Sequence, residues 1–289
     1  MTINKPILTL SVPRSTSTAL ERAFIQRTNC VCFHEPFGEP YYYGPERLST
    51  RYTDAQREQS GHAHTTYQNR IDEIKGKAAE DPTRLVFIKD MASCELNLWL
   101  LWLWWLLVSS DILVDLVKPE MMAFAGINPT VLSDEQLGEF RYAFLVRSPR
   151  KAITSYYRAI LDNDCGDFGD FDPDEAGFAE LLAMVEYIKH LYKDCQIALI
   201  DSDDLVNAPE DTLRAFCTSL GIPFEENMLH WKAQRIGEFD KWKGFHEDAQ
   251  NSTGFKPVKR DSIELPKEVE DAIQHNEPIY NELLTYALK

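Results

Sequence analysis

The turn that follows the first apolar run constrains this chain most. Ile7–Leu10 are apolar, and positions 11–20 read Ser-Val-Pro-Arg-Ser-Thr-Ser-Thr-Ala-Leu. This pattern predicts a short strand, a hydroxyl-rich turn and the start of a helix. The first N–H groups of a helix lack intrahelical partners and lie at the positive end of its dipole. The segment therefore predicts an anion site of the phosphate-binding kind, with these donors: Arg14, Ser15, Thr16, Ser17 and Thr18.

Apolar runs alternate with segments of helical periodicity along the whole chain. The runs predict buried strands at Ile7–Val12, Cys30–Phe33, Leu85–Ile88, Tyr142–Val146 and Ile197–Ile200. The periodic segments predict helices at Thr18–Gln26, Thr65–Lys77, Pro149–Leu161, Asp174–Lys193 and Pro209–Leu220. This alternation is typical of an α/β fold in three layers, with a central parallel sheet covered by helices on both faces. Ligands of such sheets bind beyond the carboxyl ends of the strands.

Length and composition fit one enzyme-sized domain. The chain has 289 residues, of which 44% are hydrophobic, so we expect a single domain over residues 1–289. No basic region followed by an apolar stretch opens the sequence, which favours a cytoplasmic protein. The six cysteines form no Cys-x-x-Cys pair, and we expect free, mostly buried thiols.

The net charge narrows the class of partner. A formal charge of −16 argues against nucleic acid or an anionic membrane surface, because both attract basic proteins. A small molecule is the expected partner. An acidic protein that binds a multiply charged anion must concentrate its cations locally, and the two candidate loops contain Arg14, Arg147, Arg150 and Lys151.

A second segment indicates which class of phosphate-containing ligand binds. The predicted strand Tyr142–Val146 is followed by Arg147-Ser-Pro-Arg-Lys-Ala-Ile-Thr-Ser155-Tyr-Tyr. Together with the Pro-Arg-Ser turn at positions 13–15, this segment resembles the two cofactor loops of sulfotransferases that use 3′-phosphoadenosine 5′-phosphosulfate (PAPS). The resemblance implies a P-loop NTPase-like sulfotransferase fold and PAPS as cofactor, with no metal required. It also implies that Arg147 and Ser155 hold the 3′-phosphate.

The first loop departs from the family pattern at two positions. Thr16 stands where family members usually carry glycine, and Arg14 stands where many carry lysine. Because a β-branched residue tolerates positive φ poorly, we expect a turn with ordinary dihedral angles or a loop of altered geometry. Arginine at position 14 keeps the positive charge.

The general base is expected after the second strand. His34-Glu35-Pro36-Phe37 places two proton acceptors at the carboxyl edge of the sheet. The resemblance implies Glu35 as base, and His34 is the alternative because its ordinary pKa of ~6.5 suits proton transfer. Lys89, at the end of the third strand, is predicted to contact the sulfuryl oxygens with Asp90 orienting it. A plain Lys89–Asp90 ion pair is the competing interpretation.

Three further segments carry weaker predictions. A basic, glycine-containing loop closes over the cofactor in the family, and its counterparts here are Gly254, Lys256, Lys259 and Arg260; a solvated loop is the alternative. The acidic run Asp162–Glu175 is interpreted as a solvated or lid loop rather than a calcium site. His62 and His64 are interpreted as exposed rather than metal-binding.

The tryptophan-rich run at residues 96–108 is too short to span a membrane, which takes about 20 apolar residues. It is predicted to be a helix in the core or at a subunit contact, which would make a homodimer, or else an apolar wall of the acceptor pocket. With Tyr41–Tyr43, it favours an apolar or aromatic acceptor.

These observations predict a sulfotransferase that moves a sulfuryl group to a hydroxyl of a small acceptor. Two alternatives remain: a non-sulfating enzyme or nucleotide-binding protein on this fold, and a P-loop phosphotransferase. The phosphotransferase needs Mg²⁺ with a carboxylate to hold it, and the first loop lacks the lysine of the Walker pattern.

Overall fold

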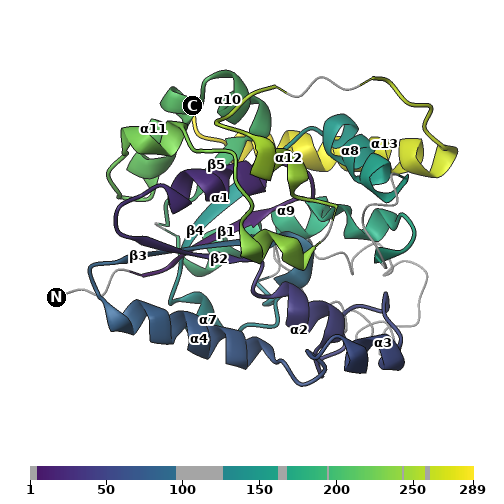
Figure 1. The fold of residues 1–289 in the computed structure, drawn as a ribbon, viewed down its shortest axis with the longest axis horizontal. Coiled ribbons are helices and arrows are strands. Elements are labelled where there is room, and N and C mark those ends of the chain that lie inside the picture. The colour runs from purple at the N-terminus through teal and green to yellow at the C-terminus, as the bar shows by residue number, and fades with distance from the viewer. Residues whose placement is uncertain (1–4, 96–125, 162–167, 194, 243, 258–260) are drawn as a thin grey trace.

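The structure is a computed structural model that describes residues 5–95, 126–161, 168–193, 195–242, 244–257 and 261–289. Its centre is a five-stranded parallel sheet in the order β2-β3-β1-β4-β5 (Figure 1). The strands are β1 Ile7–Ser11, β2 Cys30–His34, β3 Leu85–Met91, β4 Arg141–Val146 and β5 Ala198–Asp201. The three strands β1, β3 and β4 form the middle of the sheet. Their residues and those of β5 are almost all buried, whereas β2 is mostly half-buried.

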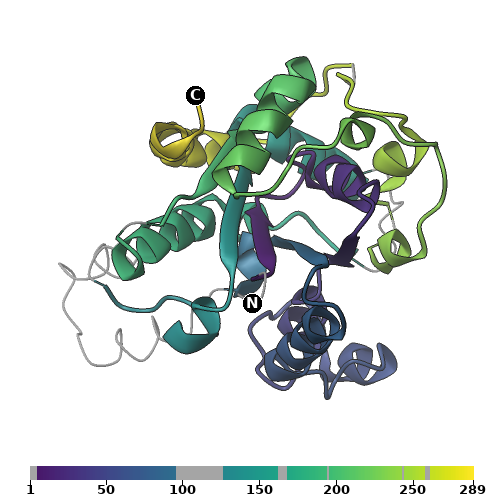
Figure 2. The ribbon, with the colours of Figure 1, turned by 90° about the vertical axis from the view of Figure 1, so that its left-hand side faces the viewer.

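Side chains of each strand alternate between two apolar clusters. On one face Ile7 and Phe87 pack with α1 and α11, and on the other Leu8 and Ile88 pack with α4 and α9. Figure 2 shows α1 and α9 on opposite sides of the sheet. The α helices of the described residues are α1 Ser17–Ile25, α2 Gly38–Tyr43, α3 Asp54–Gln59, α4 Tyr67–Glu80, α7 Asp134–Leu137, α8 Pro149–Leu161, α9 Phe178–Leu191, α10 Ser202–Asn207, α11 Pro209–Ser219, α12 Glu247–Asn251 and α13 Lys267–Leu283. The three-layer α/β architecture is therefore confirmed.

All five predicted strands and most predicted helices are confirmed to within a few residues. The predicted helix Asp174–Lys193 is divided, because Gly177 adopts a left-handed φ of 74° between the 3₁₀ turn Pro173–Ala176 and α9. The sequence analysis did not predict α13, which packs on α8 and α9 although Pro278 lies inside it.

Two other predictions bear on surface and core. The tryptophan-rich run at 96–108 lies outside the described residues. Within the described part of the chain, no helix is both long and apolar enough to span a bilayer. The five described cysteines are free thiols, but only Cys94 and Cys217 are buried, so the expectation of mostly buried thiols was wrong.

The carboxyl ends of the strands converge on one edge of the sheet. Because all five strands run in parallel, the segments that follow them lie at that same edge (Figure 1). These segments include the turn after β1, the Glu35 segment after β2 and the Arg147 segment after β4. The fold thus brings the separately predicted motifs to one place.

Candidate active site

A cavity of about 580 Å³ opens at this edge of the sheet. Segments that follow all five strands contribute to its wall. Among the described lining residues, seven are Lys or Arg and five are Asp or Glu, although the whole chain carries a formal charge of −16. The predicted local concentration of cations is therefore present, and the cavity volume lies in the range usual for small-molecule sites.

The turn before α1 keeps a left-handed backbone conformation despite its branched residue. Thr16 has φ 71° and ψ 14°, and Arg14 has φ 61°. The expectation of ordinary dihedral angles was wrong. The Thr16 hydroxyl is hydrogen-bonded to that of Ser202, after β5, and the Thr16 carbonyl accepts the N–H groups of Ala19 and Leu20. These contacts hold the strained residue in place and leave the helix N-terminus beside the cavity.

The backbone strain at Thr16 predicts which of two variants is the more stable. Both Thr16→Gly and Thr16→Ala lose the hydroxyl, but only glycine accepts the left-handed conformation without a steric penalty. Thr16→Gly is expected to be more stable than Thr16→Ala by about 1–2 kcal/mol, which urea unfolding would measure. Equal stability of the two variants, or a more stable alanine variant, would contradict the left-handed assignment.

Hydrogen bonds join Arg14, in the turn before α1, to the segment that follows β4. Arg14 Nε donates to Ser155 Oγ at 3.2 Å, and Arg147 Nη1 donates to the backbone oxygen of Arg14 at 2.8 Å. All three residues line the cavity, as do Thr16, Ser17 and Thr18. Ser15 is different: its side chain is fully buried and does not line the cavity, and its Oγ has no hydrogen-bond partner among the described residues.

Glu35 forms part of the cavity wall next to the end of β3. It is buried, adopts a left-handed φ of 45°, and its N–H donates to the backbone oxygen of Lys89 at 2.7 Å. The Lys89 ammonium donates to Glu35 Oε1, and both residues line the cavity. Lys241 Nζ donates to the carbonyl oxygens of His34 and Glu35 at 3.0 and 2.9 Å. These contacts fix the Glu35 carboxylate at the cavity.

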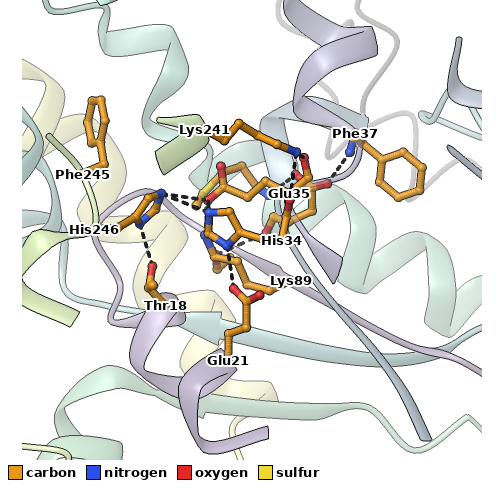
Figure 3. Close-up of polar contacts among 12 residues, drawn as sticks. Thr18, Glu21, His34, Glu35, Phe37, Lys89, Lys241, Phe245 and His246 are labelled. Atoms are coloured by element: carbon orange, nitrogen blue, oxygen red, sulfur yellow. Dashed lines mark hydrogen bonds and ion pairs between the residues drawn. The ribbon is translucent and has the colours of Figure 1, made fainter. Parts of the chain in front are cut away.

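Behind Glu35, a chain of hydrogen bonds joins α1 to the segment before α12 (Figure 3). Glu21 Oε2 lies 2.6 Å from His34 Nδ1, and His34 Nε2 lies 3.2 Å from His246 Nε2. His246 Nδ1 lies 3.0 Å from Thr18 Oγ1. Burial lowers the pKa of His34 to about 3 and that of His246 well below its ordinary value, and burial raises the pKa of Glu21 to about 8. The three groups are therefore uncharged at neutral pH.

The raised pKa of Glu21 predicts a pH-dependent stability. The folded protein keeps the Glu21 proton up to about pH 8, whereas the unfolded chain releases it near 4.5. Because the folded state keeps this proton, the Glu21 contribution to the free energy of unfolding falls as pH rises through this window. The lowered pKa values of His34 and His246 act in the opposite direction below about pH 6.5, so the comparison with a variant isolates Glu21. Glu21→Gln retains an uncharged donor for His34 and cannot titrate, so its urea-unfolding free energy should fall less, or rise more, with pH than that of the unaltered chain. Identical slopes for both proteins would contradict this assignment.

The competing Lys89–Asp90 ion pair is wrong, because Lys89 pairs with Glu35. The Asp90 carboxylate instead accepts the N–H groups of Phe37 and Met91, at 2.7 and 2.8 Å. It therefore orients the backbone that follows Glu35 rather than the lysine.

The segment near the C-terminus contributes more than its sequence indicated. Gly254 and Lys256 line the cavity, and their contact with a cofactor stays a prediction, whereas Lys259 and Arg260 lie outside the described residues. The short helix α12 lies within this segment, where no regular structure was predicted. His246 and Trp242 also line the cavity and were given no role by the sequence analysis, since no local pattern distinguishes them.

One region of the cavity wall, its aromatic end, is formed by clustered rings. Tyr42 and Trp242 pack edge to face at 5.3 Å between ring centroids, and Phe168 packs on Phe245 at 5.0 Å. Phe168 and Glu175 line the cavity, and Arg51 pairs with Glu175 at 2.7 Å. Of the two interpretations of this acidic stretch, a solvated loop is wrong for Glu175, which is buried at the cavity, and a lid loop stays a prediction; residues 162–167 lie outside the described part. His64 is exposed as predicted, and His62 is half-buried.

Comparison with known proteins assigns the family. Residues 141–287, which form more than half of the chain, match the family described as "Sulfotransferase domain". The chain belongs to the sulfotransferase family. The matched region of this sulfotransferase begins at β4 and includes Arg147 and Ser155, whereas the turn before α1 and Glu35 precede it.

Relatives of this sulfotransferase differ in length and name. "Branched-chain-amino-acid aminotransferase-like protein 1" of Arabidopsis thaliana is 30% identical over 161 residues, which are 54% of this chain and 26% of that protein. "Sulfotransferase ppzF" of Metarhizium rileyi is 28% identical over 133 residues, or 39% of this chain and 38% of the relative. The chain thus spans about a quarter of the length of the Arabidopsis relative. The "Sulfotransferase Domain from the Curacin Biosynthetic Pathway" superposes with a TM-score of 0.48 at 18% identity, covering 99% of both chains.

Proposed function

We propose that this sulfotransferase transfers a sulfuryl group from PAPS to a hydroxyl of a small apolar or aromatic acceptor, with Glu35 as general base. The observation that carries the proposal is the convergence of Arg14, Arg147, Ser155 and Glu35 on one cavity. These residues follow three different strands and meet only because the sheet is parallel. Membership of the sulfotransferase family supports the same reaction class.

The donor set fits a nucleotide with two phosphate groups. The N-terminus of α1, with Ser17, Thr18 and Arg14, suits the 5′ end, and Arg147 with Ser155 suits the 3′-phosphate. When bound, PAPS supplies the sulfuryl group, and adenosine 3′,5′-bisphosphate is the leaving group. Arg14 and the helix N-terminus stabilise the negative charge that develops on that leaving group.

Glu35 is the better candidate base because it reaches the cavity. His34 does not line the cavity, and both of its ring nitrogens contact buried partners, Glu21 and His246. Burial also lowers the pKa of His34 to about 3, which makes it a weak proton acceptor. In this proposal the Glu35 carboxylate takes the proton of the acceptor hydroxyl, and Lys89 stabilises charge on the transferring group.

The aromatic end of the cavity suits an apolar acceptor. Tyr42, Phe168, Trp242 and Phe245 all line it, and such rings bury apolar surface and pack against other rings. Phe245 also supplies the backbone oxygen to which Arg14 Nη1 donates, so this region adjoins the proposed phosphate site.

Gly38 provides a test of the acceptor end. A Cβ atom at this position would lie 2.6 Å from Trp242 Cζ2, so the indole must shift, and both residues line the cavity. Gly38→Ala is expected to raise the acceptor KM about 5- to 100-fold, for an overpacking cost of about 1–3 kcal/mol, with nucleotide affinity unchanged. Gly76→Ala is the matched control because nothing lies within 4 Å of its added Cβ. An unchanged KM in Gly38→Ala would remove this region from the acceptor site.

Mass spectrometry of reaction mixtures tests the function itself. The purified chain is incubated with PAPS and a panel of phenols and aliphatic alcohols, without added metal. The proposal expects an acceptor that gains one SO₃ group and an equal amount of adenosine 3′,5′-bisphosphate. Magnesium-dependent phosphate transfer from ATP would instead favour the phosphotransferase alternative.

A further inference from the structure

Three potential metal ligands converge at the back of the cavity. His34 Nε2 lies 3.2 Å from His246 Nε2, and Glu35 Oε1 lies 3.8 Å from the first and 3.9 Å from the second. His34 and Glu35 end β2, whereas His246 directly precedes α12 (Figure 3). All three side chains are buried, so their positions are held by the surrounding fold.

The spacing of these atoms matches the coordination distances of Zn²⁺. A point equidistant from the corners of a triangle with these three sides lies about 2.1 Å from each corner. Zinc binds imidazole nitrogen at about 2.0–2.1 Å and carboxylate oxygen at about 2.0–2.2 Å. A point within bonding distance of all three donors therefore exists, and a further ligand can reach it from the cavity, which Glu35 and His246 line.

The Nδ1 atoms of His34 and His246, which would not contact the ion, both have hydrogen-bond partners, as they do in metal sites. With both Nε2 atoms on an ion, each Nδ1 carries a hydrogen. Glu21 Oε2, at 2.6 Å, can accept that of His34, and Thr18 Oγ1, at 3.0 Å, can accept that of His246. A carboxylate or hydroxyl in this position fixes the tautomer and the orientation of a ligating histidine.

A neighbouring cation competes with a metal ion for Glu35. Lys89 donates to Glu35 Oε1, the same oxygen that an ion would use. Lys241 is paired with Glu39 at 2.8 Å and also contacts the backbone oxygens of His34 and Glu35. Arg14 donates to Ser155 and to the backbone oxygen of Phe245, the residue before His246. An ion must therefore displace the Lys89 ammonium from Glu35.

We propose that His34, Glu35 and His246 bind one Zn²⁺ ion, in competition with Lys89. The ion enters from the cavity, because Glu35 and His246 line it. Two imidazoles and one carboxylate form a donor set that suits zinc and neighbouring first-row metals. Because the ion occupies the carboxylate of the base, it inhibits transfer. The inhibition rests on the proposed function, whereas the binding does not.

Cobalt absorption tests the binding directly. The full chain is freed of metal with a chelator and titrated with Co²⁺, whose visible bands report its ligands, and Zn²⁺ is then added. The expected result is one Co²⁺ per chain with an intensified visible spectrum, which Zn²⁺ abolishes. A chain that binds no Co²⁺ or Zn²⁺ would overturn the proposal.

Variants separate this site from surface histidines. His246→Asn removes a ligand and is expected to weaken metal binding about 100-fold or more. Glu21→Gln is expected to weaken it about 10- to 100-fold, because Glu21 orients His34. Lys89→Met is expected to tighten binding, because it frees Glu35. The double variant His62→Ala/His64→Ala should bind as the unaltered chain does. Loss of binding in the double variant with retention in His246→Asn would overturn the proposal.

Thermal unfolding shows whether each variant is folded and whether Zn²⁺ stabilises it. Zn²⁺ should raise the Tm of the unaltered chain and of Lys89→Met, but not that of His246→Asn. Failure of the two proposals remains distinguishable. Stoichiometric Co²⁺ binding without sulfation of any acceptor would contradict the proposed function alone, whereas sulfation without metal binding would contradict this site alone.

Discussion

Replacing Glu35 by glutamine is expected to lower kcat for sulfation by about 10²- to 10⁴-fold, the usual contribution of a general base. The amide keeps the size of the side chain but cannot take the acceptor proton. Binding of adenosine 3′,5′-bisphosphate should be unchanged, because Arg14, Arg147 and Ser155 are untouched. Initial rates with PAPS and calorimetric binding measure the two effects separately.

Two further variants make this result interpretable. Glu35→Gln leaves the buried Lys89 ammonium without its carboxylate, which by itself destabilises the site. The double variant Glu35→Gln/Lys89→Met removes both charges and should fold well but remain inactive. His34→Asn should retain more activity than Glu35→Gln, since His34 does not line the cavity. A Glu35→Gln protein with nearly normal kcat would exclude Glu35 as base.

Replacing Arg147 by alanine is expected to have the largest effect on nucleotide affinity. A half-buried guanidinium that pairs with phosphate contributes about 2–5 kcal/mol on truncation, so the Kd for adenosine 3′,5′-bisphosphate should rise about 30-fold to several thousand-fold. The same substitution also removes the bond from Arg147 Nη1 to the backbone oxygen of Arg14. Arg147→Lys should recover part of the affinity by restoring charge without the planar fork.

Arg214→Ala is the matched control for this variant. Arg214 lies on α11, pairs with Glu210 at 2.7 Å and does not line the cavity. Its loss should leave the Kd unchanged. A similar Kd for Arg147→Ala and Arg214→Ala would mean that the segment after β4 does not contact the nucleotide.

The strands could be predicted from the sequence because of how they are buried. Parallel strands covered on both faces read as nearly continuous apolar runs, as in Tyr142–Val146 of β4 and, with Thr9 as the exception, Ile7–Leu10 of β1. Helix α13 could not be predicted in this way. It carries Pro278 in its interior, a residue that normally ends a helix, and much of its stability comes from packing on α8 and α9.

The loops of the candidate site were predictable where a short motif carried them, as at Arg14 and Arg147. The contacts of His34 and Glu35 were not, because they depend on residues distant in sequence. His246 lies 212 positions from His34, and Glu21 is an ordinary-looking glutamate within α1. Likewise, Thr16 follows the central strand β1, and its hydroxyl is bonded to that of Ser202, which follows the edge strand β5.

Calorimetric titration with adenosine 3′,5′-bisphosphate tests the central claim most directly. The chain is titrated in the presence of a chelator and again with Mg²⁺, and ATP is titrated under both conditions. The account predicts one binding site per chain for the bisphosphate, with micromolar or tighter affinity, independent of Mg²⁺ and preferred over ATP. No binding of the bisphosphate, or a magnesium-dependent preference for ATP, would contradict it.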